Sequence, residues 1–192
     1  MLNHKGTQII ETPRLILRPF TMDDAPAMFH NWASDDEVTK HLTWPTHTSA
    51  EISRRVLSDW TSHYPEPDFY NWAIVLKEYG PEPIGSIAVV GIDQKVDSAH
   101  IGYCMSRSHW RRGIMPEALT AVIAFLFDQV GFNRIEADHD PNNPASGRVM
   151  EKSGMRHEGI LRQAGRSNQG IIDVSRWAIL RSDREVHHEQ TT

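Results

Sequence analysis

The stretch from Ser98 to Gly154 constrains the fold more than any other part of the chain, because its pattern predicts several elements in a fixed order. Residues 98–105 alternate between the two faces of a half-buried strand. Pro116 suits the first position of a helix whose apolar side chains share one face, and Gly131 suits its end. Residues 134–140 then predict a second strand. This strand–helix–strand order predicts a layer of helix packed on a sheet.

A second helix is expected after residue 140, with Asn143 as its N-cap, Pro144 as its first residue and Gly154 at its end. This places the Ser146 hydroxyl in the first turn, where the helix dipole favours a developing negative charge.

The loop before the first helix is expected to bind an anion. Its backbone N–H groups converge at a helix N-terminus, where unpaired donors and the helix dipole favour a group such as a pyrophosphate. The residues concerned are Arg111, Arg112, Gly113, Ile114 and Met115.

The rest of the chain predicts further strands with helices around them. Thr21-x-x-Asp24 and Thr48-x-x-Glu51 resemble capping boxes, the first starting a helix that stops near Ser34. The expected fold is mixed α/β (α+β), with a mostly antiparallel sheet of about six to seven strands and about four helices. The remaining strands are expected at residues 15–17, 70–76, 84–90, 157–161 and 171–180, the last two joined by a turn at 167–170.

Composition indicates one domain, residues 1–192, with an ordered core at about 8–182 and polar tails at both ends, His187 and His188 included. The 20 Lys and Arg against 25 Asp and Glu give a charge of −5, which argues against a nucleic-acid partner. The single cysteine, Cys104, suits a packed thiol in a reducing cytoplasm. The sequence has neither a long apolar run nor a signal-peptide core, so no membrane partner and a cytoplasmic location are expected.

Several motifs taken together resemble the GNAT superfamily of N-acetyltransferases. They are Arg111–Met115, Asn143-Pro-Ala-Ser146, Glu151-Lys-Ser-Gly-Met155 and His157-Glu-Gly159. Glu11–Phe20 and the Asn-x-x-Ser signature resemble the RimJ/RimL branch, which acetylates N-terminal amines of ribosomal proteins.

This resemblance implies a GNAT-like domain that binds acetyl-CoA at a splay between the two central strands. It implies that Ser146 donates a proton to the leaving thiolate and that a backbone N–H of residues 103–105 stabilises the oxyanion. The implied cofactor-binding residues are Cys104, Met105, Asn143, Ser146 and Lys152, together with the five residues of the loop.

Three positions depart from the family pattern. Trp110 stands where Gln or Arg is usual, and Met115 replaces a final small residue. Both changes leave backbone donors available. His100 stands where many relatives carry Glu beside the reacting thioester.

His100 is the candidate general base, because an unperturbed histidine accepts a proton near neutrality. A surface or hydrogen-bonded histidine is the alternative, with Glu136 or Asp138 then acting through water. A strong base is not required for every acceptor. An α-amine with a pKa near 7.8 is roughly a third neutral at pH 7.5, whereas a lysine amine is neutral in about one molecule per thousand.

The expected activity is acetyl transfer from acetyl-CoA to a primary amine, most of all a protein or peptide N-terminus. Alternatives are a small-molecule amine such as a polyamine, amino acid or antibiotic, and a non-catalytic acyl-CoA sensor or interaction module. Tyr103, Trp32 and Trp44 are the candidates for the acceptor side, although core packing is favoured for both tryptophans. No metal site is expected, because strand alternation separates His139 from Asp138 and Asp140. The sequence leaves monomer and homodimer open.

Overall fold

The computed structural model describes residues 1–184, so His187, His188 and most of the predicted C-terminal tail lie outside it. Its centre is one sheet with the strand order β1-β2-β3-β4-β5-β6-β8-β7, antiparallel at every junction except the parallel pair β5–β6. The mixed, mostly antiparallel sheet is therefore confirmed. The strands are β1 (Ile10–Glu11), β2 (Leu15–Arg18), β3 (Asn71–Leu76), β4 (Pro83–Asp93), β5 (Ser98–Met105), β6 (Arg134–His139), β7 (Arg156–Ser167) and β8 (Gly170–Leu180).

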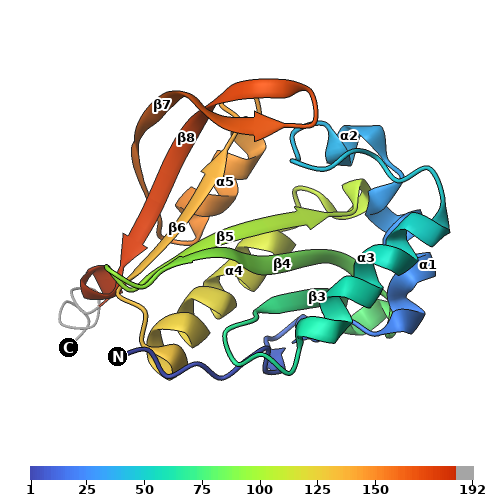
Figure 1. Ribbon diagram of the computed structural model, residues 1–192, viewed down its shortest axis with the longest axis horizontal. Helices are drawn as coiled ribbons and strands as arrows, with labels where there is room; N and C mark the ends of the chain where they lie inside the picture. Colours follow the sequence, from blue (N-terminus) through green and yellow to red (C-terminus); the bar gives the residue numbers. More distant parts are fainter. Residues whose placement is uncertain (185–192) are drawn as a thin grey trace.

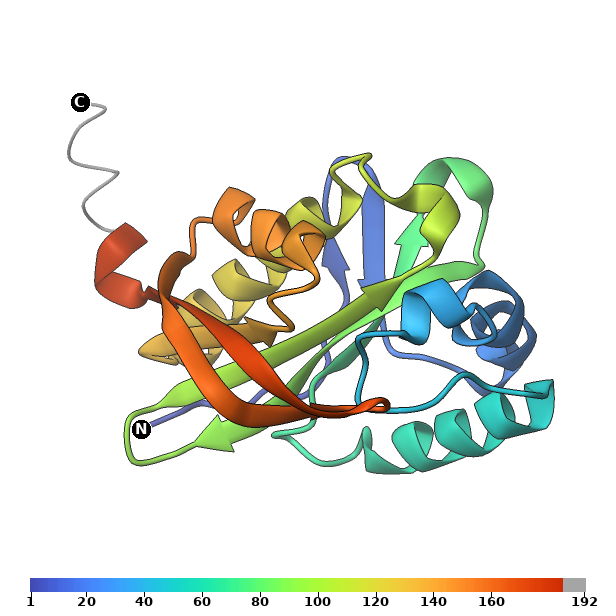
Figure 2. The ribbon, with the colours of Figure 1, turned by 90° about the horizontal axis from the view of Figure 1, so that it is seen from above.

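Helices cover both faces of this sheet (Figures 1 and 2). The helices α4 and α5 lie on one face, while α1 and α3 lie on the other. Beyond the predicted elements there is a two-residue strand, β1, and a one-turn helix, α2, both too short to show a period. The α-helices are α1 (Ala25–Met28), α2 (Asp36–Thr39), α3 (Ala50–His63), α4 (Ile114–Phe125) and α5 (Pro144–Lys152).

Two predicted helix starts were wrong. Helix α3 takes Ser49 rather than Thr48 as its N-cap, because Ser49 has the extended backbone that precedes the first turn. Helix α4 begins at Ile114 rather than Pro116. Gly113 adopts a left-handed conformation with φ of 72°, and the helix starts directly after it, two residues earlier, with Ile114 buried in the core.

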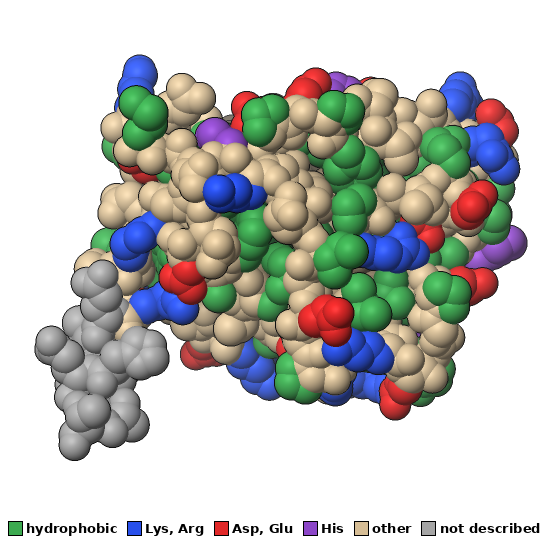
Figure 3. Space-filling model, turned by 90° about the horizontal axis from the view of Figure 1, so that it is seen from below, with side chains coloured by type: hydrophobic (Ala, Val, Ile, Leu, Met, Phe, Trp, Pro, Cys, Tyr) green, Lys and Arg blue, Asp and Glu red, His purple; other side chains and the backbone are tan. Residues whose placement is uncertain are grey.

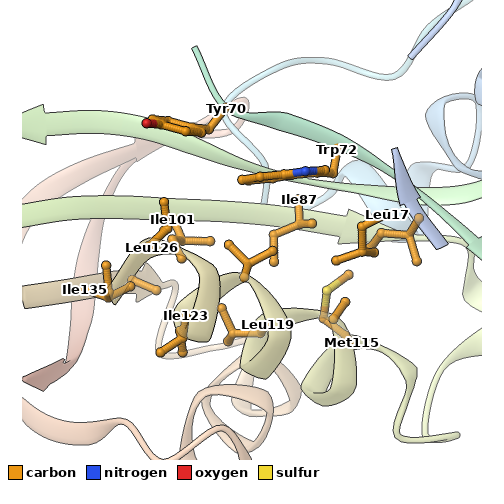
Figure 4. Packing of buried hydrophobic residues seen from close by; sticks show 14 of the residues in the cluster. Leu17, Tyr70, Trp72, Ile87, Ile101, Met115, Leu119, Ile123, Leu126 and Ile135 are labelled. Atoms are coloured by element: carbon orange, nitrogen blue, oxygen red, sulfur yellow. The ribbon is translucent and has the colours of Figure 1, made fainter. Parts of the chain in front are cut away.

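The main core lies between the sheet and α4. Figure 4 shows side chains of the strands directed toward successive turns of that helix, with Ile87 and Ile101 above Leu119 and Ile123. Each such side chain contributes about 1.5–3 kcal/mol by leaving water. This packing fixes α4, and hence the loop before it, against β5.

A second core lies on the opposite face, under α1 and α3. Trp32 is completely buried there beside Phe20 and Leu57. The core role favoured for Trp32 is therefore confirmed, and its ring does not line an exposed acceptor surface.

The expectation that the N-terminal stretch does not pack was wrong. The Asn3 amide donates to the Val130 carbonyl at 2.7 Å, and His4 Nδ1 lies 3.0 Å from the Tyr70 hydroxyl. The stretch is attached through backbone and side-chain hydrogen bonds, which a polar composition does not reveal.

The strands β5 and β6 separate part-way along their length. Their pairing ends at Ile101 and Ala137, whereas β5 continues to Met105 beside β4 alone. Figure 1 shows β6 and the β7–β8 hairpin turning away from β5 beyond this point. The separation, called the split below, exposes one edge of β5 next to the start of α5.

The surface carries charges of both signs. On the face shown in Figure 3, basic and acidic side chains are interspersed with apolar ones. Among residues 1–184, no helix has the length and apolar character that crossing a membrane requires.

Candidate active site

The loop before α4 presents unpaired backbone donors. Arg111 has a φ of 61° and Gly113 a φ of 72°, so the chain alternates its handedness over three residues, as in anion-binding nests. Within residues 1–184, none of the amides from Arg111 to Met115 donates to another protein group, and the Glu117 amide is the first to do so, to Gly113. The loop thus has the donors that an anion requires.

The structure explains both departures in this loop. The Trp110 indole N–H donates to the Met105 carbonyl at 2.8 Å, which joins the loop to the end of β5. The Met115 side chain is buried in the main core, as Figure 4 shows. Both side chains support the loop from behind and leave its amides free.

The turn between β1 and β2 supports the same loop. The Arg14 guanidinium donates to the Glu117 carboxylate at 2.6 Å and to the Arg112 carbonyl at 2.9 Å. Burial opposes the charge on Glu117, but hydrogen bonds from Thr12 and Arg14 outweigh it and lower the pKa of Glu117 overall.

A hydrogen-bonded pair bridges the split. The Tyr103 hydroxyl of β5 donates to the Ser146 carbonyl of α5 at 3.1 Å and lies 2.9 Å from the Ser146 hydroxyl. Burial raises the pKa of Tyr103, so its hydroxyl stays protonated and remains a donor. Ser146 therefore lies at the split, in the first turn of its helix.

The other predicted residues of α5 lie at its two ends. Asn143 is at the N-cap, but its side chain makes no capping hydrogen bond, contrary to expectation, and it remains without a side-chain partner in the described chain. The Asn143 amide donates to the Asp140 carbonyl at 2.7 Å, which fixes the backbone of the turn before α5. Lys152 is exposed in the last turn, at the opposite end of α5 from Ser146.

The open edge of β5 carries a backbone donor. The Ser106 amide donates to the Ile84 carbonyl on the β4 side at 2.8 Å. Because successive residues of a strand alternate, the amides of Tyr103 and Met105 face the other side, toward the split. Pairing with β6 stops before Tyr103, and this leaves its amide available there.

His100 lies among charged residues on the opposite face of the sheet from Tyr103. Its Nδ1 is 3.9 Å from the Glu136 carboxylate and its Nε2 is 3.7 Å from the Asp138 carboxylate. Arg176 binds both oxygens of Asp138, at 2.9 and 2.8 Å, and Arg134 donates to Glu136 at 3.1 Å. The two carboxylates are thus already paired.

Two further predicted residues, Cys104 and Trp44, pack against the second core. The Cys104 Sγ lies 3.3 Å from the Ser86 hydroxyl, and burial raises the pKa of the thiol to about 11. Such a thiol is a poor nucleophile at neutral pH. The Trp44 ring is half-buried and lies 5.2 Å from the His47 ring, centre to centre.

Comparison with known proteins identifies the family. The model of the acetyltransferase (GNAT) domain matches residues 14–156. The chain belongs to the GNAT family of acetyltransferases. It is 34% identical over 173 residues to YoaA of Bacillus subtilis, an uncharacterized N-acetyltransferase, covering 90% of this chain and 97% of that protein.

Two other GNAT proteins agree with a RimJ/RimL-like branch. The ribosomal-protein-serine acetyltransferase of Escherichia coli is 28% identical over 71% of this chain and 75% of its own length. The structure of RimL, an alpha-N-protein acetyltransferase in complex with coenzyme A, superposes with a TM-score of 0.79 at 23% identity, covering 90% of this chain and 98% of that one. At that identity the likeness shows the shared GNAT fold.

Sequence reasoning missed several contacts in this GNAT domain. Arg134 and Arg176 hold the carboxylates beside His100, His41 contacts Asp140, and Asn168 contacts Trp44 in the segment after α2. Only Arg134 had a local signal, since it shares a strand face with Glu136. The other contacts join residues far apart in the chain.

Proposed function

We propose that this N-acetyltransferase uses acetyl-CoA to acetylate the N-terminal amine of a protein or peptide. The observation that carries the proposal is the pair formed by Tyr103 and Ser146, whose hydroxyls lie 2.9 Å apart across the split. This pair would supply a proton donor beside the open edge of β5.

Acetyl-CoA fits the groups that the chain presents. The pyrophosphate would bind the free amides of Arg111–Met115, where Arg111 and Gly113 form the alternating backbone. The Asn143 side chain, without a protein partner in the described chain, would meet the amide groups of the pantetheine arm.

Acetyl-CoA supplies a thioester, and attack by a neutral amine forms a C–N bond and an oxyanion, whose collapse breaks the C–S bond and releases a thiolate. Ser146 would donate a proton to that sulfur, oriented by Tyr103. Its position in the first turn of α5 adds the stabilising effect of the helix dipole. The Tyr103 amide on the open edge of β5 would donate to the oxyanion.

His100 would accept the proton that the amine loses. The acceptor nitrogen and the leaving sulfur are different substituents of the same carbon, so a base and an acid on opposite faces of the sheet suit the reaction. Asp138 and Glu136 hold charge-assisted hydrogen bonds from arginines and are weaker candidates than the sequence indicates.

A protein N-terminus is favoured as the acceptor on two grounds. Its α-amine has far more neutral form near pH 7.5 than a lysine or polyamine amine, so it needs little help from a base and a histidine is sufficient. The relative from Escherichia coli is named for action on a ribosomal protein.

An acceptor panel tests the proposal. Release of CoA thiol from acetyl-CoA is measured with short peptides bearing a free N-terminus, with the same peptides blocked at the N-terminus, and with spermidine and an aminoglycoside. We expect turnover with the free peptides and none with the blocked ones. Turnover confined to spermidine or the aminoglycoside would replace the protein acceptor by a small molecule, and absence of turnover with every amine would contradict the choice of acceptors.

A further inference from the structure

The segment 39–47, called the strap, connects α2 to α3 and is tied to the strands that form the split. Figures 1 and 2 show the turn of the β7–β8 hairpin reaching the chain beside α2. The Asn168 amide in that turn donates to the Leu42 carbonyl at 2.8 Å. The contact joins residues far apart in the sequence. It connects the β7–β8 hairpin, at one edge of the sheet, to the chain that follows α2.

The Asn168 side chain adds two more hydrogen bonds. Its Nδ2 donates to the Thr39 carbonyl at 3.0 Å and to the Trp44 carbonyl at 3.1 Å. Both protons of the side-chain amide are thereby used, and they join two points of the strap that are five residues apart. One side chain therefore fixes both the shape of the strap and its distance from the hairpin.

Other contacts place the strap next to the split. His41 Nδ1 in the strap lies 2.9 Å from the carboxylate of Asp140, which directly follows β6. Just before the strap, Asp35 pairs with Arg107, which follows β5, at 2.9 Å. The chain around the strap is thus attached to the ends of both strands that separate at the split, on the side where α2 and the hairpin meet.

We propose that Asn168 is a positioning residue that holds the strap as a wall of the acceptor site and so determines how tightly an extended acceptor binds. The inference rests on the proposed function, because it takes the acceptor to enter on the side of the split that carries His100. A strap that samples other positions lowers the fraction of molecules competent to bind, and the apparent acceptor affinity falls by the same factor.

Two variants and one control separate this role from a general structural one. Asn168→Ala removes both side-chain donors, and Asn168→Asp keeps the size but cannot donate to carbonyls. Gln169→Ala is the matched control, since Gln169 is the exposed neighbour in the same turn and its side chain has no hydrogen bond within residues 1–184, while its backbone amide donates to the Ser167 hydroxyl.

Hydrogen exchange of the amides in residues 39–47 tests the attachment without any assay of activity. Faster exchange is expected in both Asn168 variants and unchanged exchange in Gln169→Ala. Equal exchange in all four proteins would overturn the proposal at this step.

Steady-state kinetics then tests the consequence. For a peptide acceptor, both Asn168 variants should raise KM about 5- to 100-fold, the range that two ordinary hydrogen bonds correspond to, with kcat and acetyl-CoA affinity within about twofold. Ethylamine, too small to reach a wall, should keep its KM. An unchanged peptide KM, or a parallel loss of kcat and acetyl-CoA affinity, would overturn the positioning role. If the wild-type enzyme acetylates no peptide, the proposed acceptor fails, and the same comparison is made with the largest amine that it acetylates.

Discussion

At the scale of single residues, the proposed mechanism assigns its two proton transfers to opposite faces of the sheet. Tyr103 and Ser146 lie on the face of α4 and α5, whereas His100 lies on the other face beside Glu136 and Asp138. The two sets meet only where β5 and β6 part. Donation to sulfur and removal of the amine proton are therefore assigned to different residues and can be tested one at a time.

Replacement of His100 by Ala tests the base. The rate with a lysine-like amine should fall more than the rate with an α-amine, because the former has far less neutral form and depends more on proton removal. The rates are compared at one pH with two peptides that offer one amine each. His30→Ala, at an exposed histidine just after α1, is the control. Equal rates for His100→Ala and wild type with both amines would make His100 structural and would return the role to Glu136, Asp138 or water.

Local spacing predicts some of these residues but not their contacts. The positions of Asn143 and Ser146 at a helix start were predicted, because a helix start is marked by a few neighbouring residues. The contact between Tyr103 and Ser146 spans 43 residues, and that between Arg176 and Asp138 spans 38. Such pairs depend on how strands align, which the period of one segment does not reveal.

At the scale of elements, the loop before α4 depends on its backbone conformation. Gly113→Val should reduce acetyl-CoA affinity by at least about tenfold, since a β-branched residue is strained at the φ of 72° that directs the amides into the cradle. Calorimetric titration with acetyl-CoA measures the change. A Cβ at this position would meet only Arg14 at 3.6 Å, an ordinary contact, so the effect is one of conformation.

Gly131→Val is the matched control for that titration. Gly131 has the same left-handed conformation, with φ of 100° and ψ of 17°, and an added Cβ would lie 3.9 Å from Arg181, so it carries comparable strain at the other end of the helical stretch. Its affinity for acetyl-CoA should equal that of the wild type. Equal affinities for Gly113→Val and wild type would show that acetyl-CoA does not use this loop.

Most elements were predicted from their alternation or helical spacing, and two short ones, β1 and α2, were not. The strand at residues 98–105 was predicted with its observed bounds, and Gly131 ends the helical stretch begun by α4, with a φ of 100°. The strand β1 and the helix α2 have two and four residues, too few for a period. The predicted start of α4 was two residues too late, because the observed start depends on the packing of Ile114 in the core, which the local pattern does not show.

At the scale of the whole molecule, stability depends on the core between the sheet and α4. Leu119→Ala should lower the free energy of unfolding by about 2–5 kcal/mol, because Leu119 is completely buried and its loss leaves a cavity. Denaturant unfolding measures the change. Ile9→Ala, at a side chain 64% exposed, should stay within about 0.5 kcal/mol of the wild type. If Leu119→Ala lowers the free energy of unfolding as little as Ile9→Ala does, the packing between the sheet and α4 is not the main source of stability.

The order of elements predicted a mixed, mostly antiparallel sheet flanked by helices, but not that β5 and β6 are the parallel pair. The attachment of the N-terminal stretch and of the strap was not predictable. Both attachments consist largely of hydrogen bonds to backbone carbonyls and amides. Nearly every residue carries these groups, so the sequence gives no signal for such contacts.

Replacement of Ser146 by Ala tests the whole account most directly. Turnover and acetyl-CoA affinity are measured on the same variant. Ser146→Ala should lower kcat with the best peptide acceptor by about 10- to 10⁴-fold and leave the Kd of acetyl-CoA within a few-fold, because a proton donor acts mainly in the transition state. Ser62→Ala, at an exposed serine of α3, should change neither value. A kcat for Ser146→Ala equal to that of the wild type would reduce Ser146 to a residue of the helix start and contradict the mechanism proposed for the split.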